Sequence, residues 1–293
     1  MPYSDIIKKL KDERIPTLEA VSGKAYSAFG SGGLIACVIE PLSVEQLITA
    51  LAILSGTRYA IIACGSNILI ADKGIDILLS LKRLSSITVL SGGFECLAGT
   101  RLATITALAE RCGFSGAEFL VDIPGTFGGA VVMNAGAFGG EMKDILKSVT
   151  LFEDGKIVKR RPDELKMGYR RSAVGSRIVI GGILKLDYGE YNEIRELTAR
   201  YREYRMCTQP FGRSLGSVFK RVDGISPAVY IEKTDLKGLT IGGAELSKKH
   251  CNFIINRGNA KSDDYLAIAN RVSEEVAKQG ITLELENILL GYD

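Results

Sequence analysis

The sequence predicts an α+β fold, because helix and strand signals are interspersed along all of its 293 residues. Some stretches have the caps and apolar spacing of amphipathic helices, while short β-rich stretches end in glycine turns. No repeat of fixed period is visible, which argues against a repeat architecture. At 46% hydrophobic and 24% charged residues, the composition is that of a globular protein. The length favours two or three domains, and we place boundaries near residues 80 and 207.

The first half contains two predicted helices and a strand. Residues 43–56 begin with a capping box, Ser43 and Gln46, and end at Gly56, which predicts an amphipathic helix. Residues 58–67 form a short apolar stretch that ends in a Gly-Ser-Asn turn, as a strand would. The helical pattern returns over residues 100–113, where Cys112-Gly113 marks the end.

The second half adds a hairpin, further strands and two helices. Asp154-Gly155 in "SVTLFEDGKIVKRR" is a strong hairpin turn, residues 176–190 predict a strand, and residues 193–205 a charged helix. Ser262 is expected to cap a helix that buries Tyr265, Ile268, Val272 and Val276 and ends at Gly280. "ITLELENILL", residues 281–290, predicts a strand with Glu284 and Glu286 on one face.

Composition excludes several classes of function. A net charge of +3 is too small to indicate nucleic-acid binding. The charged N-terminal stretch is no signal peptide, and no apolar stretch approaches the roughly 20 residues of a membrane span, so a cytoplasmic protein without membrane insertion is expected. The six cysteines are scattered without a CxxC pair, which favours reduced thiols over a disulfide or metal framework. With His250 as the only histidine, a multi-histidine metal site is impossible.

A glycine-rich segment is the strongest functional signal. "VDIPGTFGGAVVMNAGAFGGE", residues 121–141, holds six glycines, although glycine weakens regular structure. Pro124 leads into Gly125 and Thr126, and successive N–H groups at Gly128 and Gly129 could form a nest for an anion. Asn134 can donate and accept, and Gly136 leaves room beside it.

Two shorter glycine turns, "FGSGG" at residues 29–33 and "CGSN" at residues 64–67, follow apolar stretches. Three such turns favour nucleotide binding, against the alternative of unrelated turns. The GxGxxG signature is absent, which disfavours a Rossmann site. The stretch from Lys156 to Arg177 contains eight basic residues and only two acidic ones. This run is either a solvated face or a basin for an anionic ligand such as a phosphate.

Taken together, the motifs resemble those of the bacterial UDP-N-acetylenolpyruvoylglucosamine reductases, which catalyse the second step of peptidoglycan precursor synthesis. "IPGTFGGAVVMNAGAFGGE" resembles the flavin-binding core of that family. "GSNILIADKG", "GYRRS", "GSVFK", "LKGLTIGGAELSKKHCNFIIN" and "GITLELENILLG" follow the family's order over nearly the whole chain. No long insertion follows "YRRSAV", as in the shorter form of the family, which lacks an extra tyrosine-bearing loop.

The resemblance implies a flavin-binding fold of the vanillyl-alcohol-oxidase (PCMH) type with two α+β subdomains, residues 1–80 and 81–206. A C-terminal α+β substrate-binding domain would occupy residues 207–293. FAD would be bound non-covalently, and NADPH would deliver hydride to it. The substrate would be UDP-N-acetylglucosamine enolpyruvate and the product UDP-N-acetylmuramate. A monomer is expected.

The family's motifs also assign roles to single residues. Ser217, from "GSVFK", would be the proton donor, Arg170 would hold the substrate carboxylate and stabilise negative charge, and Glu286 would act on the developing enol. The substrate-binding positions would be Tyr169, Lys220 and Lys237. The cofactor-binding positions would be Gly65, Ser66, Asn67, Ile68, Pro124, Gly125, Thr126, Gly128, Gly129, Asn134 and Gly136.

Each catalytic residue has an alternative interpretation. Ser217 could be a turn residue, Arg171 lies beside Arg170, and Glu284 shares a predicted face with Glu286; only the motif register separates them. His250 is interpreted as structural or as a neighbour of a ligand, without a catalytic role.

The sequence departs from the family at three places. Lys220 is followed by Arg221 instead of an asparagine on the substrate side, which puts the details of UDP-sugar binding in doubt. The stretch Ala28–Gly33 lacks a usual threonine, and Ala63-Cys64 replaces two glycines before Gly65.

Two other functions compete with the reductase. One is a different FAD oxidoreductase of the same fold, such as an oxidase of alcohols or sugars. The other is a catalytically diverged nucleotide-binding protein, which would be colourless when purified.

Overall fold

The structure, a computed structural model, describes residues 3–292 and divides them into two compact units. The first unit comprises the described residues up to Thr17, Ile39–Cys64 and Leu79–Arg205. The second unit comprises Leu18–Val38, Gly65–Leu78 and the described residues from Met206 onward. The chain therefore passes between the units several times, and each unit is assembled from segments that lie far apart in the sequence.

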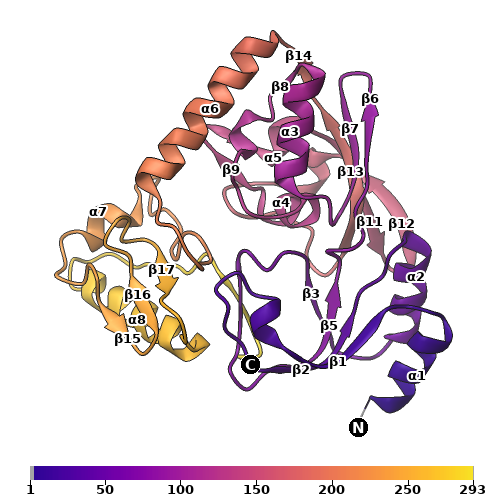
Figure 1. The fold of residues 1–293 in the computed structure, drawn as a ribbon, viewed down its shortest axis with the longest axis horizontal. Helices are drawn as coiled ribbons and strands as arrows, with labels where there is room; N and C mark the ends of the chain where they lie inside the picture. The colour runs from indigo at the N-terminus through magenta and orange to yellow at the C-terminus, as the bar shows by residue number, and fades with distance from the viewer. Residues whose placement is uncertain (1–2, 293) are drawn as a thin grey trace. The chain divides into compact units, whose positions relative to one another are not determined.

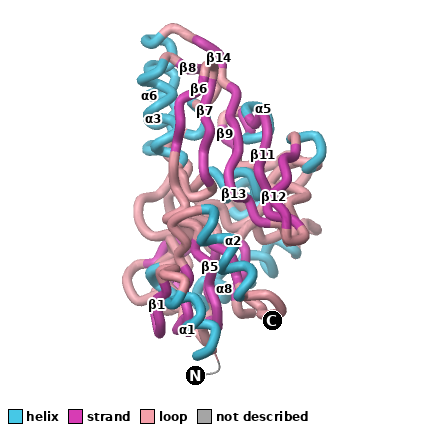
Figure 2. Tube along the Cα trace, turned by 90° about the vertical axis from the view of Figure 1, so that its right-hand side faces the viewer, coloured by secondary structure: helices cyan, strands magenta, loops and turns pink. Residues whose placement is uncertain are grey.

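The first unit is built on a five-stranded antiparallel sheet of order β12-β11-β13-β7-β6. Figure 2 shows these strands side by side. Their bounds are β6 Ile87–Leu90, β7 Gly93–Leu97, β11 Leu146–Glu153, β12 Lys156–Arg160 and β13 Ile178–Lys185. The turn between β11 and β12 consists of Asp154 and Gly155 with φ of +48° and +76°. This confirms the predicted hairpin, since turns with two positive φ values match the twist of the paired strands.

Helices and short strands complete the first unit, and α4 packs against β7 and β13. The helices are α1 Ser4–Asp12, α2 Val44–Ile53, α3 Leu102–Cys112, α4 Phe127–Met133, α5 Met142–Ile145 and α6 Tyr191–Thr208. Helix α6 belongs to the first unit as far as Arg205. Two 3₁₀ turns, η2 Glu118–Leu120 and η3 Pro162–Leu165, lie in the same unit. The short strands are β3 Ala60–Ile62, β8 Phe114–Ser115, β9 Gly136–Ala137, β10 Gly140–Glu141 and β14 Asp187–Tyr188.

Two of these helices follow the local signals in the sequence. Ser43 Oγ accepts from the amide of Gln46 at 3.2 Å, and Gln46 Oε1 accepts in turn from the amide of Leu42, so α2 begins where predicted. α3 ends at Gly113 with φ of +67°, the left-handed conformation that favours glycine after a helix.

The second unit combines small sheets with a long helix. Most of β1 Thr17–Ser22, β2 Leu34–Ile39 and β5 Ile75–Ser80 belongs to it, and these strands are neighbours in that order. In the same unit β4 Ile68–Ile70 pairs in parallel with β18 Ile288–Leu290. The remaining elements are η1 Gly23–Ala25, α7 Pro227–Ile231, β15 Thr240–Ile241, β16 Ala244–Leu246, β17 Ile254–Asn256 and α8 Ser262–Ala277. Strands β15, β16 and β17 form an antiparallel sheet, against which α8 packs (Figure 1).

The core of the second unit lies under α8, as the apolar spacing predicts. Tyr265, Ile268, Val272 and Val276 are all fully buried. The rings of Tyr265 and Phe29 meet edge to face with centroids 5.0 Å apart. Burying one aliphatic side chain, such as that of Ile268, stabilises a fold by roughly 1.5–3 kcal/mol. These contacts therefore anchor the helix that supports the C-terminal segment.

Two predictions for this region are wrong. Ser262 does not cap α8 but is its first residue, and its Oγ donates to the carbonyl of Ile70 at 2.6 Å instead. The predicted strand over residues 281–290 is regular only at Ile288–Leu290. In both cases a partner distant in the sequence, which local pattern does not reveal, determines the conformation.

Candidate functional site

Ser217 lies in a short extended segment directly after a glycine turn. Gly216 has φ of +78°, which residues with side chains rarely adopt. After this turn Ser217 forms an antiparallel bridge with Phe253, and the amide of Val218 donates to the carbonyl of Asn252 at 2.9 Å. The backbone around the half-buried Ser217 is therefore held in place by hydrogen bonds.

The segment that carries Glu286 runs beside this serine. The amide of Glu286 donates to the carbonyl of Val218 at 2.8 Å, and the amide of Lys220 donates to the carbonyl of Glu284 at 2.9 Å. The structure thus brings together the backbones of Ser217 and Glu286, two predicted catalytic residues from distant parts of the chain.

The two carboxylates on this segment differ in their surroundings. Glu284 is exposed, and its Oε1 accepts from Nζ of Lys220 at 2.5 Å. Glu286 is half-buried. Glu284 is therefore the surface partner of a lysine, whereas the backbone of Glu286 lies beside the segment of Ser217; the choice of Glu286 by the motif register stays a prediction.

Both predicted substrate lysines pair with carboxylates of the protein. Besides the Lys220 pair, Nζ of Lys237 lies 3.6 Å from Oε1 of Glu232, with both side chains well exposed. Exposed ion pairs contribute only about 0–1 kcal/mol, so a phosphate ligand can replace these carboxylates at small cost. Arg221 is also exposed and reaches the carbonyl of Gly224 at 3.4 Å.

The turn Gly65–Ile68, expected to bind the cofactor, is anchored within the second unit. Gly65 has φ of +63°, and its carbonyl accepts from the amide of Ala28 at 3.0 Å. Asn67 Nδ2 donates to the carbonyl of Glu286 at 3.0 Å. The expected cofactor turn and the late acidic segment are therefore joined by a direct hydrogen bond.

In the first unit, three of the six glycines of the glycine-rich segment, Gly128, Gly136 and Gly140, leave little or no room for a side chain. A Cβ on Gly128 would lie 3.0 Å from Cβ of Ala98, and one on Gly136 only 2.5 Å from the carbonyl oxygen of Gly140. The amide of Gly128 donates to the carbonyl of Ala98 at 2.9 Å. The predicted anion nest is wrong at Gly128, because this N–H already has a partner.

Gly129 and Thr126 are different. Gly129 is exposed, and a Cβ there would meet only Thr126 Oγ1, at an ordinary 3.8 Å. Thr126 is 2% exposed, and among residues 3–292 its Oγ1 has no hydrogen-bond partner. Buried polar groups are normally hydrogen-bonded. Thr126 Oγ1 therefore keeps an unused hydrogen-bonding capacity beside a glycine that the protein's own packing does not require.

The side chain of Asn134 makes its hydrogen bonds within the protein. The residue is fully buried at φ of +42°, and its Nδ2 donates to Glu141 Oε2 at 3.0 Å and to the carbonyl of Gly168 at 3.1 Å. Its Oδ1 accepts from the amide of Lys143 at 3.0 Å. Both N–H groups of the amide are used, so its direct role is to fix the hairpin that begins at Gly168.

Arg170 occupies the tip of that hairpin. The amide of Gly168 donates to the carbonyl of Arg171, and the amide of Arg171 donates to the carbonyl of Gly168. These two bonds close a two-residue turn in which Arg170 has φ of +52°. Nη2 of Arg170 donates to the carbonyl of Gly136 at 2.9 Å, and its guanidinium lies 5.0 Å from the ring centroid of Tyr169. The turn thus directs Arg170 to the glycine-rich segment, a distinction from Arg171 that the sequence alone does not make.

His250 is held as a neutral ring. Its Nδ1 accepts from the amide of Asn252 at 3.3 Å, and its ring contacts Phe253 edge to face. Burial lowers the pKa of His250, because the charged form loses water. Across the described part of the chain, no three His, Cys, Asp or Glu side chains are arranged to hold a metal ion.

The six cysteines are free thiols, and Cys37, Cys96 and Cys251 are buried. Burial raises the pKa of Cys96 to about 12 and that of Cys251 to about 11. Thiols in this state are poor nucleophiles, so these cysteines contribute packing rather than chemistry.

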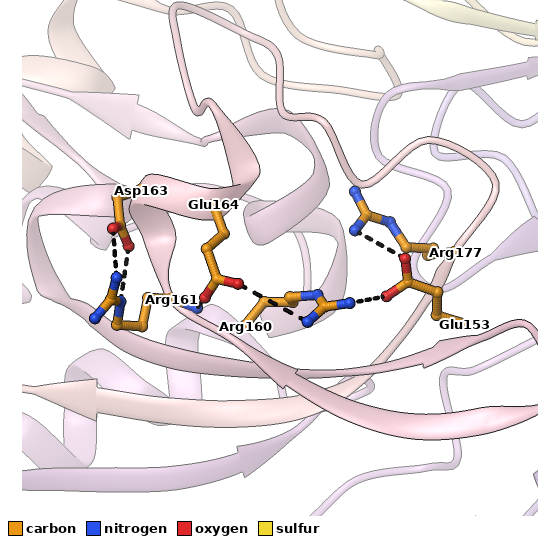
Figure 3. Close-up of polar contacts among 6 residues, drawn as sticks. All are labelled: Glu153, Arg160, Arg161, Asp163, Glu164 and Arg177. Carbon is orange, nitrogen blue, oxygen red and sulfur yellow. Dashed lines mark hydrogen bonds and ion pairs between the residues drawn. The ribbon is translucent and has the colours of Figure 1, made fainter.

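Part of the basic run is a surface ion-pair network (Figure 3). Arg160 Nη2 lies 2.8 Å from Glu153 Oε2, and Nη1 of Arg177 lies 3.6 Å from Oε1 of the same glutamate. Arg161 binds Asp163 through two nitrogens at 3.2 and 3.0 Å. These three arginines therefore favour the solvated-face interpretation over a basin for an anion.

Asn287 is a buried polar residue that the sequence analysis does not identify. Its amide contacts Tyr265, Asn67 and the carbonyl of Ser217. The only sequence signal was an asparagine inside an apolar C-terminal stretch, which does not reveal its partners.

Comparison with known proteins agrees with this arrangement. A family model described as an FAD binding domain matches residues 35–160, and one described as UDP-N-acetylenolpyruvoylglucosamine reductase, C-terminal domain, matches residues 208–290. The reductase of that name from Clostridioides difficile is 36% identical over 300 residues, 99% of this chain and 98% of the relative. That from Geobacter metallireducens is 38% identical, with 92% of each chain covered.

Solved structures agree with the sequence matches. UDP-N-acetylenolpyruvylglucosamine reductase from Thermus caldophilus superposes with a TM-score of 0.83 and 34% identity, covering 94% of this chain and 99% of that one. Phl p 4.0202, a glucose dehydrogenase, has a TM-score of 0.51 at 14% identity over 64% of this chain, a likeness of fold alone. The predicted α+β flavin-binding fold with a further C-terminal domain is confirmed. Among residues 3–292, no helix is long and apolar enough to cross a bilayer.

Proposed function

The chain belongs to the UDP-N-acetylenolpyruvoylglucosamine reductase family, and we propose that it reduces the enolpyruvyl group of UDP-N-acetylglucosamine enolpyruvate to form UDP-N-acetylmuramate. It is an FAD-dependent oxidoreductase of peptidoglycan precursor synthesis, and NADPH is its co-substrate. The observation that carries the catalytic assignment is the pairing of the segments of Ser217 and Glu286.

The residues fit a bound FAD. Thr126 Oγ1, buried and unpaired among the described residues, offers a donor beside the uncrowded Gly129. In the first unit Pro124, Gly125, Thr126, Gly129 and Gly136 would hold the cofactor, with Gly128 and Asn134 shaping the segment. In the second unit the turn Gly65–Ile68 would do so. When bound, FAD supplies hydride transfer between NADPH and the enolpyruvyl carbon.

Ser217 would deliver the proton. Hydride adds to one carbon of the enolpyruvyl double bond, and the electron pair of that bond then takes the hydroxyl proton of Ser217 at the other carbon. The serine alkoxide regains a proton from water. Serine is a weak acid, yet the enolate-like carbon is a strong base, so this transfer is downhill. The hydrogen bonds around Val218 hold the backbone that carries this hydroxyl.

Two further side chains would manage charge. Arg170, whose guanidinium is oriented by Gly136, would bind the substrate carboxylate and stabilise the negative charge that develops next to it. Glu286 would act on the developing enol as a hydrogen-bond partner or through a water. On the substrate side, Tyr169, Lys220 and Lys237 would bind the UDP-sugar, and the lysines would exchange carboxylate partners for its diphosphate.

The test is to purify the protein, record its visible spectrum and mix it without oxygen, first with NADPH and then with the UDP-sugar. A yellow protein that NADPH bleaches and the UDP-sugar reoxidises supports the proposal. The Ser217→Ala variant should still be bleached by NADPH, but the UDP-sugar should reoxidise it roughly 10²–10⁴-fold more slowly than the wild-type protein. Ser226→Ala is the control, because Ser226 makes no side-chain cap bond. A protein that NADPH bleaches but the sugar does not reoxidise contradicts the substrate assignment.

We also propose that the protein is a monomer in the cytoplasm. Free thiols at all six cysteines suit a reducing compartment. Light scattering behind size-exclusion chromatography tests the oligomeric state. A mass near twice 31.6 kDa would contradict it.

A further inference from the structure

A partly buried chain of hydrogen bonds through side-chain amides connects the carbonyl of Ser217 to the expected cofactor turn. Asn287 Nδ2 donates to the carbonyl of Ser217 at 3.2 Å and to Oδ1 of Asn67 at 2.9 Å. Tyr265 donates its hydroxyl to Oδ1 of Asn287 at 2.5 Å. We propose that Asn287 is a positioning residue, which holds the backbone of Ser217 and the side chain of Asn67 at a fixed spacing. This inference rests on the proposed function, because Asn287 acts through Ser217.

The chemistry of the partners determines which way each amide faces. A backbone carbonyl only accepts hydrogen bonds, so the Asn287 atom beside the Ser217 carbonyl must be the nitrogen. In the same way Asn67 presents its nitrogen to the carbonyl of Glu286 at 3.0 Å and its oxygen to Asn287. Oδ1 of Asn287 then faces Tyr265, whose hydroxyl must donate. Every amide orientation in the network is therefore the only one that satisfies all of its partners.

Strand register explains why two distant asparagines meet. Strands β4 and β18 are parallel neighbours in which Ile68 pairs with Ile288, and the amide of Ile288 donates to the carbonyl of Asn67 at 2.9 Å. Asn67 and Asn287 each precede one of these paired residues. Equivalent positions on neighbouring strands lie about 5 Å apart, within reach of two amide side chains. The pairing thus joins the cofactor turn to the segment of Glu286.

Tyr265 keeps the network in one state. It is the fourth residue of α8 and is fully buried. Burial, followed by the charge of Glu286, raises the pKa of Tyr265. Its hydroxyl therefore remains protonated, and Asn287, which is 7% exposed, always receives the same donor. A rigid core thus sets the position of the serine.

A small displacement of Ser217 should matter more than its effect on stability suggests. A misplacement of about 1 Å can lower a rate by about 10²-fold. Flavin reduction by NADPH does not need the Ser217 proton, whereas reoxidation by the UDP-sugar does. Loss of the Asn287 amide should therefore slow one half-reaction and spare the other.

The experiment compares Asn287→Leu and Tyr265→Phe with Val276→Ala. Val276 lies in the same buried face of α8, eleven residues beyond Tyr265, which is roughly 16 Å along a helix. Four quantities are measured: melting temperature, the Kd for FAD by flavin fluorescence on stripped protein, the rate of flavin reduction by NADPH, and the rate of reoxidation by the UDP-sugar.

We expect Asn287→Leu to slow reoxidation by roughly 10–100-fold, to raise the FAD Kd by about tenfold and to keep flavin reduction within about threefold of wild type. Val276→Ala should lower the melting temperature as much as Asn287→Leu does, with little change in the other three quantities. If both half-reactions fall equally, or if Asn287→Leu behaves like Val276→Ala, the inference is wrong.

Two situations need a second measurement. If Asn287→Leu does not fold, Tyr265→Phe decides, since it removes one hydroxyl and should slow reoxidation by roughly threefold or more; an unchanged rate overturns the inference. If the wild-type protein is not reoxidised by the UDP-sugar, the proposed function fails. The FAD Kd of Asn287→Leu then decides, because an unchanged Kd overturns the link to Asn67 and a tenfold rise supports it.

Discussion

Asn67 donates its side-chain amide to the carbonyl oxygen of Glu286 at 3.0 Å. This bond joins a turn expected to bind the cofactor to a segment expected to complete the catalytic chemistry. The two residues are far apart in the sequence and come together because β4 and β18 pair in parallel. The two expected roles, cofactor binding and proton transfer, would therefore share one support within the second unit, and the effect of changing either residue should be measured on both.

Glu286 and Glu284 should differ sharply when neutralised. Glu286→Gln should lower kcat by roughly 10²-fold or more, as for loss of a group that acts in proton transfer. Glu284→Gln removes only the partner of Lys220 and should change kcat by less than about threefold, since exposed pairs contribute little. Steady-state kinetics with the UDP-sugar would measure both. Equal losses would show that the half-buried position of Glu286 has no catalytic meaning.

Two glycine substitutions should separate packing from ligand binding. Gly136→Ala puts a Cβ 2.5 Å from the backbone oxygen of Gly140, so the melting temperature should fall. Gly129→Ala meets no close neighbour in the first unit and sits inside α4, where alanine is favoured over glycine by about 1 kcal/mol. The fold should therefore remain stable while the FAD Kd rises about tenfold or more, a change that flavin fluorescence would report. An unchanged Kd would remove Gly129 from the cofactor site.

The single histidine should make stability depend on pH in one window. Burial lowers the pKa of His250 below its unfolded value of about 6.5. Below that pH the unfolded chain binds a proton that the folded chain does not, so stability falls as pH drops from about 6.5 toward the lowered pKa. The slope should stay below about 1.4 kcal/mol per pH unit, because at most one bound proton distinguishes the folded from the unfolded chain. Urea unfolding between about pH 5.5 and 7.5 would measure it.

His250→Gln should remove that slope and leave kcat nearly unchanged. A slope that persists in the variant would assign it to other groups. A large loss of kcat would give His250 the catalytic role that its contacts with Asn252 and Phe253 argue against.

Local signals in the sequence predicted the elements that depend on neighbouring residues. The Ser43 cap of α2, the glycine after α3 and the Asp154-Gly155 hairpin were all confirmed, because each acts within a few residues of the backbone that it shapes. The buried face of α8 followed from the helical period in the same way. Family motifs identified the candidate residues Ser217, Arg170 and Glu286 from order and spacing, without any knowledge of contacts.

Predictions failed where the deciding partner lies elsewhere in the chain. Ser262 bonds to Ile70 instead of capping its helix, and the amide of Gly128 bonds to Ala98 instead of forming a nest. The sequence does not reveal the place of Asn287, because its partners are Asn67, Tyr265 and Ser217, none of them adjacent to it.

The sequence by itself therefore determined the class of fold, the family and the set of candidate residues, since these depend on composition, period and motif order. It did not reveal how the surroundings of Glu284 and Glu286, or of Arg170 and Arg171, differ. Those surroundings depend on hydrogen bonds between segments brought together by strand pairing and burial. A polar side chain satisfies its donors and acceptors with whichever groups the folded chain places nearby.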